Sequence, residues 1–284
     1  MPQTTTTTRR TPFLSGGPEA LFRVSDVVGD SALVSGSMHT GPWMSGPDGS
    51  ASLGSLGVLV DDALAYAVLA DRPEGSWAVS TEISVELCAA PSMDGSALRS
   101  TSSVVARDAT GGLARGEVRD ERGRVVAFAS QRLRFSPGVP ATLETPGFDA
   151  DRGMPAIGVA EPGRPRPGVL ETLGATVISG DARARLALPS SPWLVNPMGN
   201  VHGGILLCVS EVAGLVALQS EAHPLATTAV HISYVRPAPL RGEVTVAAEV
   251  LHRGRTLGVA QVRTLTASGK VATVATVTAQ RPAG

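Results

Sequence analysis

A short stretch in the second half of the chain combines a polar loop, a His-Gly-Gly turn and an apolar helix carrying one acid. It reads NPMGNVHGGILLCVSEVAGL over residues 196–215. The acid, Glu211, is expected to have a role, because a buried unpaired charge costs several kcal/mol unless its pKa shifts. The glycines let a ligand approach the backbone, and the first turn of a helix offers unpaired N–H groups to an oxyanion. This combination indicates chemistry at a carbonyl group, such as acyl transfer or acyl hydrolysis.

The chain carries nearly the same pattern twice, at an offset of about 150 residues. A period this long indicates a duplicated domain rather than a solenoid. The loops differ in length, but the order of the segments is kept. The matching segments are 19–38 with 171–190, 55–69 with 205–219, 80–95 with 227–242, and 120–133 with 266–279.

Each copy is expected to consist of a helix followed by several strands. The segment 204–220 is apolar nearly throughout, which predicts a helix that is buried on almost every side. Alternating stretches rich in Val and Thr then predict antiparallel strands over 226–235, 243–252, 256–266 and 270–280. Such strands pack most simply as a sheet curled around the helix, so the fold class is α+β.

Four parts of the chain are predicted from these patterns. Residues 1–15 form a disordered tail, 16–136 a first and diverged domain, and 169–284 a second domain with the His-Gly-Gly motif. Residues 137–168 are rich in Pro and Gly and are interpreted as a connector. Gly180-Asp181 is expected to be a hairpin turn.

The composition excludes several classes of protein. The net charge of −1 gives no basic excess for a nucleic-acid partner. No window reaches the length of a membrane span. Cys88 and Cys208 make neither a disulfide framework nor a zinc motif, and both are expected to be buried. No metal or redox cofactor is expected, and the cytoplasm is the expected compartment, since no targeting segment is visible.

At this point the residues resemble the hotdog-fold acyl-CoA thioesterases, in particular the PaaI-like group related to the 4-hydroxybenzoyl-CoA thioesterases. The resemblance is carried by Asn196, by His202-Gly203-Gly204, by Glu211 and by the strand pattern that follows. It implies two tandem hotdog domains, each an antiparallel sheet wrapped around a central helix, that form a pseudo-dimer. It also implies an acyl-CoA substrate, with coenzyme A only as part of that substrate, and assembly of the units into homo-oligomers.

In the resembled family, the acid of one hotdog works with the glycine turn of its partner. Gly204 and Glu211 are seven positions apart, roughly 10 Å along a helix. One helix therefore cannot easily supply both groups to one thioester carbon. A tandem chain is expected to combine them across its two copies.

The two copies are unequal at these positions. Gly46, Ser52 and Leu53 of the first copy stand where the second has Asn196, His202 and Gly203, whereas Gly54 matches Gly204. Both copies keep the acid and the strand hydroxyl, which are Asp61 and Ser80 in the first and Glu211 and Thr227 in the second. Adjacent helical residues point about 100° apart, so only one of Asp61 and Asp62 is expected to face the site.

The main site is therefore expected to combine Asn196, His202 and Gly203 with Asp61 and Ser80. Glu211 and Thr227 belong to a second site whose polar loop is lost. In the main site, the Gly203 N–H and the helix N-terminus would stabilise the oxyanion. Asp61 would act as general base or as nucleophile, and the sequence leaves both open. Arg253 and Arg255 are weaker candidates for binding the phosphates of coenzyme A. Gly204 is a further candidate for contact with coenzyme A.

Two other functions remain open at this stage. A hotdog hydratase or dehydratase would place a catalytic His just after an Asn-Pro pair, but the His here leads directly into Gly-Gly. A non-catalytic acyl-CoA-binding module would fit the decayed loop of the first copy. The intact second loop favours thioester hydrolysis over both.

Overall fold

The computed structural model describes residues 16–140, 168–179, 183–219, 224–239 and 241–282. The predicted tail (1–15), most of the predicted connector (137–168) and the predicted turn at Gly180-Asp181 lie outside the described residues.

The two halves of the chain repeat one order of elements. The first half comprises α1 (Gly17–Leu21), β1 (Val24–Gly29), β2 (Val34–His39), η1 (Pro42–Met44), η2 (Leu53–Leu56), α2 (Gly57–Leu69), β3 (Ser76–Leu87), β4 (Ala97–Asp108), β5 (Gly111–Asp120) and β6 (Val125–Pro137). The second comprises α3 (Val169–Leu173), β7 (Thr176–Ser179), β8 (Arg185–Leu188), η4 (Pro192–Leu194), α4 (Gly203–Leu218), β9 (Ala226–Tyr234), β10 (Val244–Arg253), β11 (Leu257–Leu265) and β12 (Val271–Gln280). The helix and four strands predicted for the second half are confirmed, with ends shifted by at most two residues.

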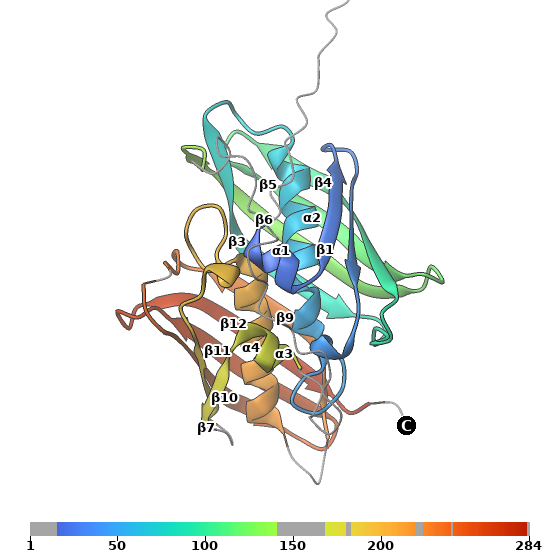
Figure 1. Cartoon of the computed structure of the whole chain (residues 1–284), viewed down its shortest axis with the longest axis vertical. Helices are drawn as coiled ribbons and strands as arrows, with labels where there is room; N and C mark the ends of the chain where they lie inside the picture. The colour runs from blue at the N-terminus through green and yellow to red at the C-terminus, as the bar shows by residue number, and fades with distance from the viewer. Residues whose placement is uncertain (1–15, 141–167, 180–182, 220–223, 240, 283–284) are drawn as a thin grey trace, which may run out of the picture.

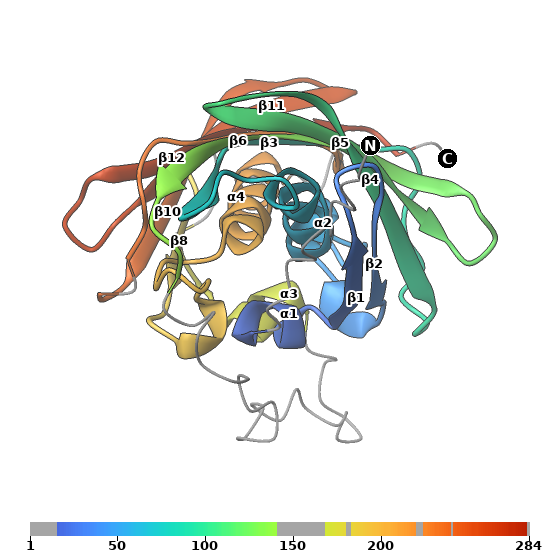
Figure 2. The same ribbon diagram turned by 90° about the horizontal axis from the view of Figure 1, so that it is seen from above.

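The strands form one antiparallel sheet whose order is symmetric about its centre. That order is β1-β2-β4-β5-β6-β3-β9-β12-β11-β10-β8-β7, so corresponding strands follow one another from either end. The halves meet where β3 pairs with β9, with Ile83 opposite Ile232. Figure 2 shows the sheet arching over α2 and α4, which lie side by side on its concave face. The described part thus has the α+β character expected from the sequence.

The two central helices cross at a pair of glycines. A Cβ on Gly57 would lie 2.3 Å from the Gly204 carbonyl oxygen, and a Cβ on Gly204 would lie 2.4 Å from the Gly57 oxygen. Both helices are buried on nearly every side, because each packs against the sheet and against the other helix (Figure 1). This close crossing brings the N-terminal ends of the two helices together.

The loops before the two helices have the same backbone hydrogen bonds. Gly46 donates to Ser50 over 2.7 Å, and Asn196 donates to Asn200 over 2.8 Å. Gly46 and Asn196 therefore occupy equivalent positions in the two loops, as their alignment in the sequence predicts. The side chain of Asn196 has been lost from the first half without a change in the path of its loop.

Two further expectations can be compared with the structure. Cys208 is buried as expected, but the expectation for Cys88 is wrong, because this residue follows β3 at its exposed end. Within the described ranges, no helix combines the length and the apolar character needed to cross a bilayer.

Candidate active site

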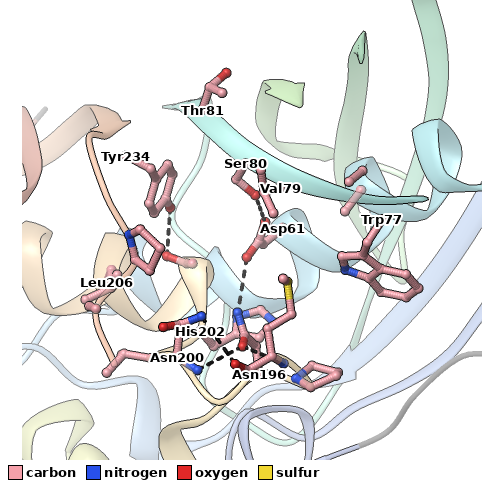
Figure 3. A pocket seen from close by; sticks show the side chains of 18 of the residues that line it. Asp61, Trp77, Val79, Ser80, Thr81, Asn196, Asn200, His202, Leu206 and Tyr234 are labelled. Atoms are coloured by element: carbon pink, nitrogen blue, oxygen red, sulfur yellow. Dashed lines mark hydrogen bonds and ion pairs between the residues drawn. The ribbon is translucent and has the colours of Figure 1, made fainter. Parts of the chain in front are cut away.

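The carboxylate of Asp61 lies where the first half meets the N-terminus of α4. Its Oδ1 accepts hydrogen bonds from Ser80 Oγ on β3 over 3.1 Å and from Gln131 Nε2 on β6 over 2.5 Å. Its Oδ2 accepts from the Gly204 N–H over 2.9 Å. Figure 3 shows Asp61 between Ser80 and the loop that carries His202. Three donors from three elements therefore fix this carboxylate in one orientation.

Gly203 leaves open space beside the acid. A Cβ at this position would lie 2.5 Å from Asp61 Oδ2, so any larger residue would displace the carboxylate. The first N–H groups of a helix lack an intrahelical acceptor. Among the described residues, none accepts a hydrogen bond from the Gly203 N–H. This N–H is thus available to a carbonyl oxygen, and the positive end of the helix dipole adds to its effect.

The loop before α4 is held by the side chain of Asn196. The Asn196 Oδ1 accepts from the backbone N–H groups of Met198 over 3.0 Å and Asn200 over 3.1 Å. Its amide oxygen is therefore used within the loop, which leaves only the NH₂ group for a ligand. The Tyr234 hydroxyl of β9 donates to the Gly203 carbonyl over 2.7 Å and fixes the glycine turn from the opposite side.

His202 is the N-cap residue of α4 and is buried among carboxylates of the first half. Its ring nitrogens lie 3.3 Å from Asp61 Oδ2 and 3.3 Å from Asp62 Oδ1, and its Nε2 is 3.7 Å from Glu19 Oε1. Burial disfavours a charged imidazole, but the contact with Asp62 and the neighbouring carboxylates raise the pKa of His202 to about 10. Burial and the charge of Glu19 raise the pKa of Asp62 to about 7, although the contact with His202 acts to lower it.

A cavity of about 400 Å³ opens beside these groups. Its polar end contains Asp61, Ser80, Asn196, His202 and Gly203, and Arg236 also lines it. The remaining wall is mostly apolar and comes largely from α2 and β3, which suits an acyl group. That wall includes Ala65, Leu69, Trp77, Ala78, Val79 and Leu206.

The corresponding acid of the second half, Glu211, is in a closed environment. It is fully buried, and it accepts hydrogen bonds from Ser52 Oγ and Thr227 Oγ1, each over 2.5 Å. Burial raises the pKa of Glu211, although bonds from Ser52, Thr227 and the Gly54 N–H oppose this. Neither Glu211 nor its two hydroxyl partners line the cavity beside Asp61.

Most of the residues proposed from the sequence for the main site lie together. Asp61 and Ser80 of the first half face His202, Gly203 and Gly204 of the second, as the cross-copy hypothesis requires. The expectation that only one of Asp61 and Asp62 faces the site is wrong. Both acids line the cavity. Asp61 contacts β3 and α4, and the His202 ring lies between the two acids, with one ring nitrogen 3.3 Å from each.

Arg253 and Arg255 do not line this cavity. The Arg253 guanidinium donates to the Ala217 carbonyl near the end of α4, and Arg255 lies in the turn that follows β10. The role in binding coenzyme A that the sequence suggested for them stays a prediction.

Gln131 belongs to the site but was missed in the sequence. Its Nε2 donates to both Asp61 and Ser80, and it is fully buried. The signal was present in the repeat. Gln131 of β6 pairs with Ile83 of β3, and in the second half Val277 of β12 pairs with Val230 of β9. Gln131 is therefore a polar residue at the position where the other copy has the apolar Val277.

The comparisons with known proteins agree with this geometry. The model of the thioesterase superfamily matches residues 198–273, and that of the acyl-CoA thioesterase C-terminal domain matches residues 5–135. A protein of Halobacterium salinarum with the provisional name of an esterase is 35% identical over 129 residues, which are 42% of this chain and 82% of that protein. The chain belongs to the thioesterase superfamily.

Solved structures show the same fold over nearly the whole chain. The tesB protein of Mycobacterium avium subsp. paratuberculosis has a TM-score of 0.62 at 11% identity and covers 95% of this chain and 100% of its own. An acyl-CoA thioesterase II, TesB2, of Mycobacterium marinum has a TM-score of 0.61 at 12% identity, with coverages of 94% and 98%. A hot dog-fold protein of Alicyclobacillus acidocaldarius has a TM-score of 0.59 at 14% identity, with coverages of 95% and 100%. These structures confirm the expected hotdog fold. The matches to the thioesterase family models confirm the expected thioester hydrolase activity.

Proposed function

We propose that this chain hydrolyses acyl-CoA thioesters at one main site between two tandem hotdog domains, residues 16–136 and 169–284, which act as a pseudo-dimer. The observation that carries the proposal is the contact between Asp61 Oδ2 and the Gly204 N–H over 2.9 Å. It joins an acid of the first half to the helix N-terminus of the second, at the polar end of an apolar cavity. The mirrored strand order supports the pseudo-dimer.

The proposed reaction begins with attack by water on the thioester carbonyl carbon. Asp61 takes a proton from the water as general base, and Ser80 and Gln131 hold the carboxylate in position. The carbonyl oxygen becomes an oxyanion and accepts from the Gly203 N–H. The intermediate then expels the thiolate of coenzyme A, which receives the proton from Asp61. These steps need no metal or redox cofactor.

The donors around Asp61 favour the base over the nucleophile. To form a bond with the carbonyl carbon, the carboxylate would have to leave Ser80, Gln131 and the Gly204 N–H. As a base it stays in place and has to exchange only one of its contacts for the proton of the water. A single turnover in H₂¹⁸O distinguishes the two roles. We expect ¹⁸O in the released acid and none in Asp61, whereas an anhydride opened by water at the Asp61 carbonyl would leave ¹⁸O in the Asp61 carboxylate and none in the released acid.

The site around Glu211 is proposed to be inactive. Leu53, which is buried, replaces Gly203, and Ser52, which replaces His202, donates a hydrogen bond to Glu211. A raised pKa and full burial suit a structural carboxyl group. Glu211 and Thr227 are therefore assigned to packing between the two domains.

The function is tested by measuring thiol release from short, medium, long and aromatic acyl-CoA esters. We expect release from at least one ester and no hydration of the matching enoyl-CoA. Hydration without thiol release would favour the hydratase, and binding without turnover would identify an acyl-CoA-binding module. Either result would contradict the proposal.

A further inference from the structure

Both ring nitrogens of His202 face carboxylate oxygens of the first half. Nδ1 is 3.3 Å from Asp61 Oδ2, and Nε2 is 3.3 Å from Asp62 Oδ1. A ring nitrogen without a proton presents a lone pair, which a carboxylate oxygen repels. A neutral imidazole has one such nitrogen, whereas an imidazolium donates from both. The geometry is therefore that of an imidazolium.

The Gly204 N–H is consistent with this assignment. It lies 2.9 Å from Asp61 Oδ2 and 3.1 Å from His202 Nδ1, and since a protonated Nδ1 cannot accept, the assignment makes Asp61 the acceptor of this N–H. The shorter contact is the one to Asp61. Asp61 Oδ2 then accepts from both the helix N-terminus and the imidazolium.

Two buried carboxylates next to His202 have no part in the reaction as described so far. Asp62 is 6% exposed, and its Oδ2 has no hydrogen-bond partner within the described residues. Glu19 is 3% exposed, and its Oε2 accepts from the Gly16 N–H over 2.6 Å, which directs Oε1 toward His202. Burying two carboxylates is costly unless a positive charge compensates them. His202 is the cationic partner that both contact among the described residues.

We propose that Asp62 and Glu19 are positioning residues that hold His202 as an imidazolium against Asp61. This inference rests on the proposed thioesterase function. The imidazolium places a positive charge beside Asp61 and near the developing oxyanion. Asp62 and Glu19 keep the proton on His202. The other titratable groups that line the cavity are Tyr66 of α2, Tyr234 of β9 and Arg236 after β9, and none supplies a competing carboxylate.

The charge of His202 is measured by ¹⁵N NMR of the full chain labelled at histidine nitrogens. The His202 signals are identified by their absence in His202→Gln. In the wild type we expect both ring nitrogens to stay protonated through about pH 8, since the neighbouring carboxylates oppose loss of the proton. In Asp62→Asn and Glu19→Gln, the midpoint should fall by about one pH unit or more, because a negative charge next to the cation is removed.

Activity gives a second readout of the same change. The alkaline limb of kcat/KM should move to lower pH in both variants by the shift that NMR reports. A merely structural role would lower activity at every pH without moving the limb. Glu74→Gln removes an exposed carboxylate after α2 and should change neither the midpoint nor the profile.

Three results would overturn the inference. The first is a wild-type His202 that titrates near 6.5, the ordinary value for histidine. The second is an unchanged midpoint in both variants. The third is a zinc-dependent gain in activity or Tm that Asp62→Asn abolishes, because the ligand atoms of Glu19, Asp62 and His202 lie within 4.8 Å of one another and a cation could bridge them. If no ester releases thiol, the proposed function fails, while the NMR titration still decides the charge of His202.

Discussion

At the scale of residues, Asp61 and Glu211 occupy equivalent places but have different surroundings. Each accepts from a strand hydroxyl, Ser80 for Asp61 and Thr227 for Glu211. Asp61 also accepts from Gln131 and lines a cavity, whereas Glu211 is closed in by Ser52. The difference in chemistry between the two halves therefore follows from a few side chains around a pair of acid and hydroxyl that both halves share.

Gln131→Val places in β6 the residue that β12 has at the equivalent position. We expect kcat to fall at least tenfold, because Asp61 and Ser80 lose the donor that orients them. The free energy of unfolding should change little, since valine suits a buried strand position. Steady-state kinetics and urea unfolding measure both quantities. Gln261→Val on β11, outside the cavity, is the control, and an unchanged kcat in Gln131→Val would remove Gln131 from the site.

The sequence predicted the acids, the glycine turn and the unequal loops, because each has a counterpart at a fixed offset. It could not place Glu19 next to His202, since this contact joins residues of different halves that no motif relates. It also assigned one of Asp61 and Asp62 to the site on helical geometry alone. His202 lies against both, and the position of a residue from another element cannot be read from the helix itself.

At the scale of elements, the start of α4 determines which half supplies the oxyanion donor. The α-helix of the second half begins at Gly203, whereas in the first half η2, a 3₁₀ turn over Leu53–Leu56, precedes α2. The glycine crossing then brings the start of α4 to Asp61. Helix positions were predictable from their apolar stretches, but the 3₁₀ turn was not, because its residues are also suited to an α-helix.

The crossing of α2 and α4 predicts a large effect of adding one methyl group. Gly57→Ala and Gly204→Ala would each place a Cβ within 2.4 Å of a carbonyl oxygen on the other helix. We expect each to destabilise the fold by about 1–3 kcal/mol, since backbone cannot move aside cheaply. Urea unfolding midpoints measure this. Gly46→Ala, whose Cβ would be 3.3 Å from its nearest neighbour, should cost much less, and equal costs would contradict the crossing.

At the scale of the whole molecule, the sheet and the core run without a break from one half to the other. Strands β3 and β9 pair at the centre, and the main apolar core contains Ile83 of β3, Ile232 of β9 and residues of both central helices. The duplication was predictable from the repeat of segments. The join between β3 and β9 was not, because the repeat does not specify which strand edges meet.

This continuity predicts one cooperative unfolding transition. Trp43 and Trp77 report on the first half, and Trp193 reports on the second. We expect the fluorescence of Trp193→Phe and that of the double variant Trp43→Phe/Trp77→Phe to give one transition each in urea. Within each variant this transition should coincide with loss of far-UV circular dichroism. A separate transition for either half would show that the halves unfold independently.

The central claim is that one acid, Asp61, acts with the glycine turn of the other half. The most direct test compares thiol release by Asp61→Asn and Glu211→Gln, using the best ester of the wild type and checking each fold by circular dichroism. We predict a loss of roughly 10²–10⁴-fold in kcat/KM for Asp61→Asn, the usual contribution of a general base. Glu211→Gln should retain activity within about fivefold, because its carboxyl group is buried away from the cavity. A folded Glu211→Gln without activity, beside an active Asp61→Asn, would contradict the account.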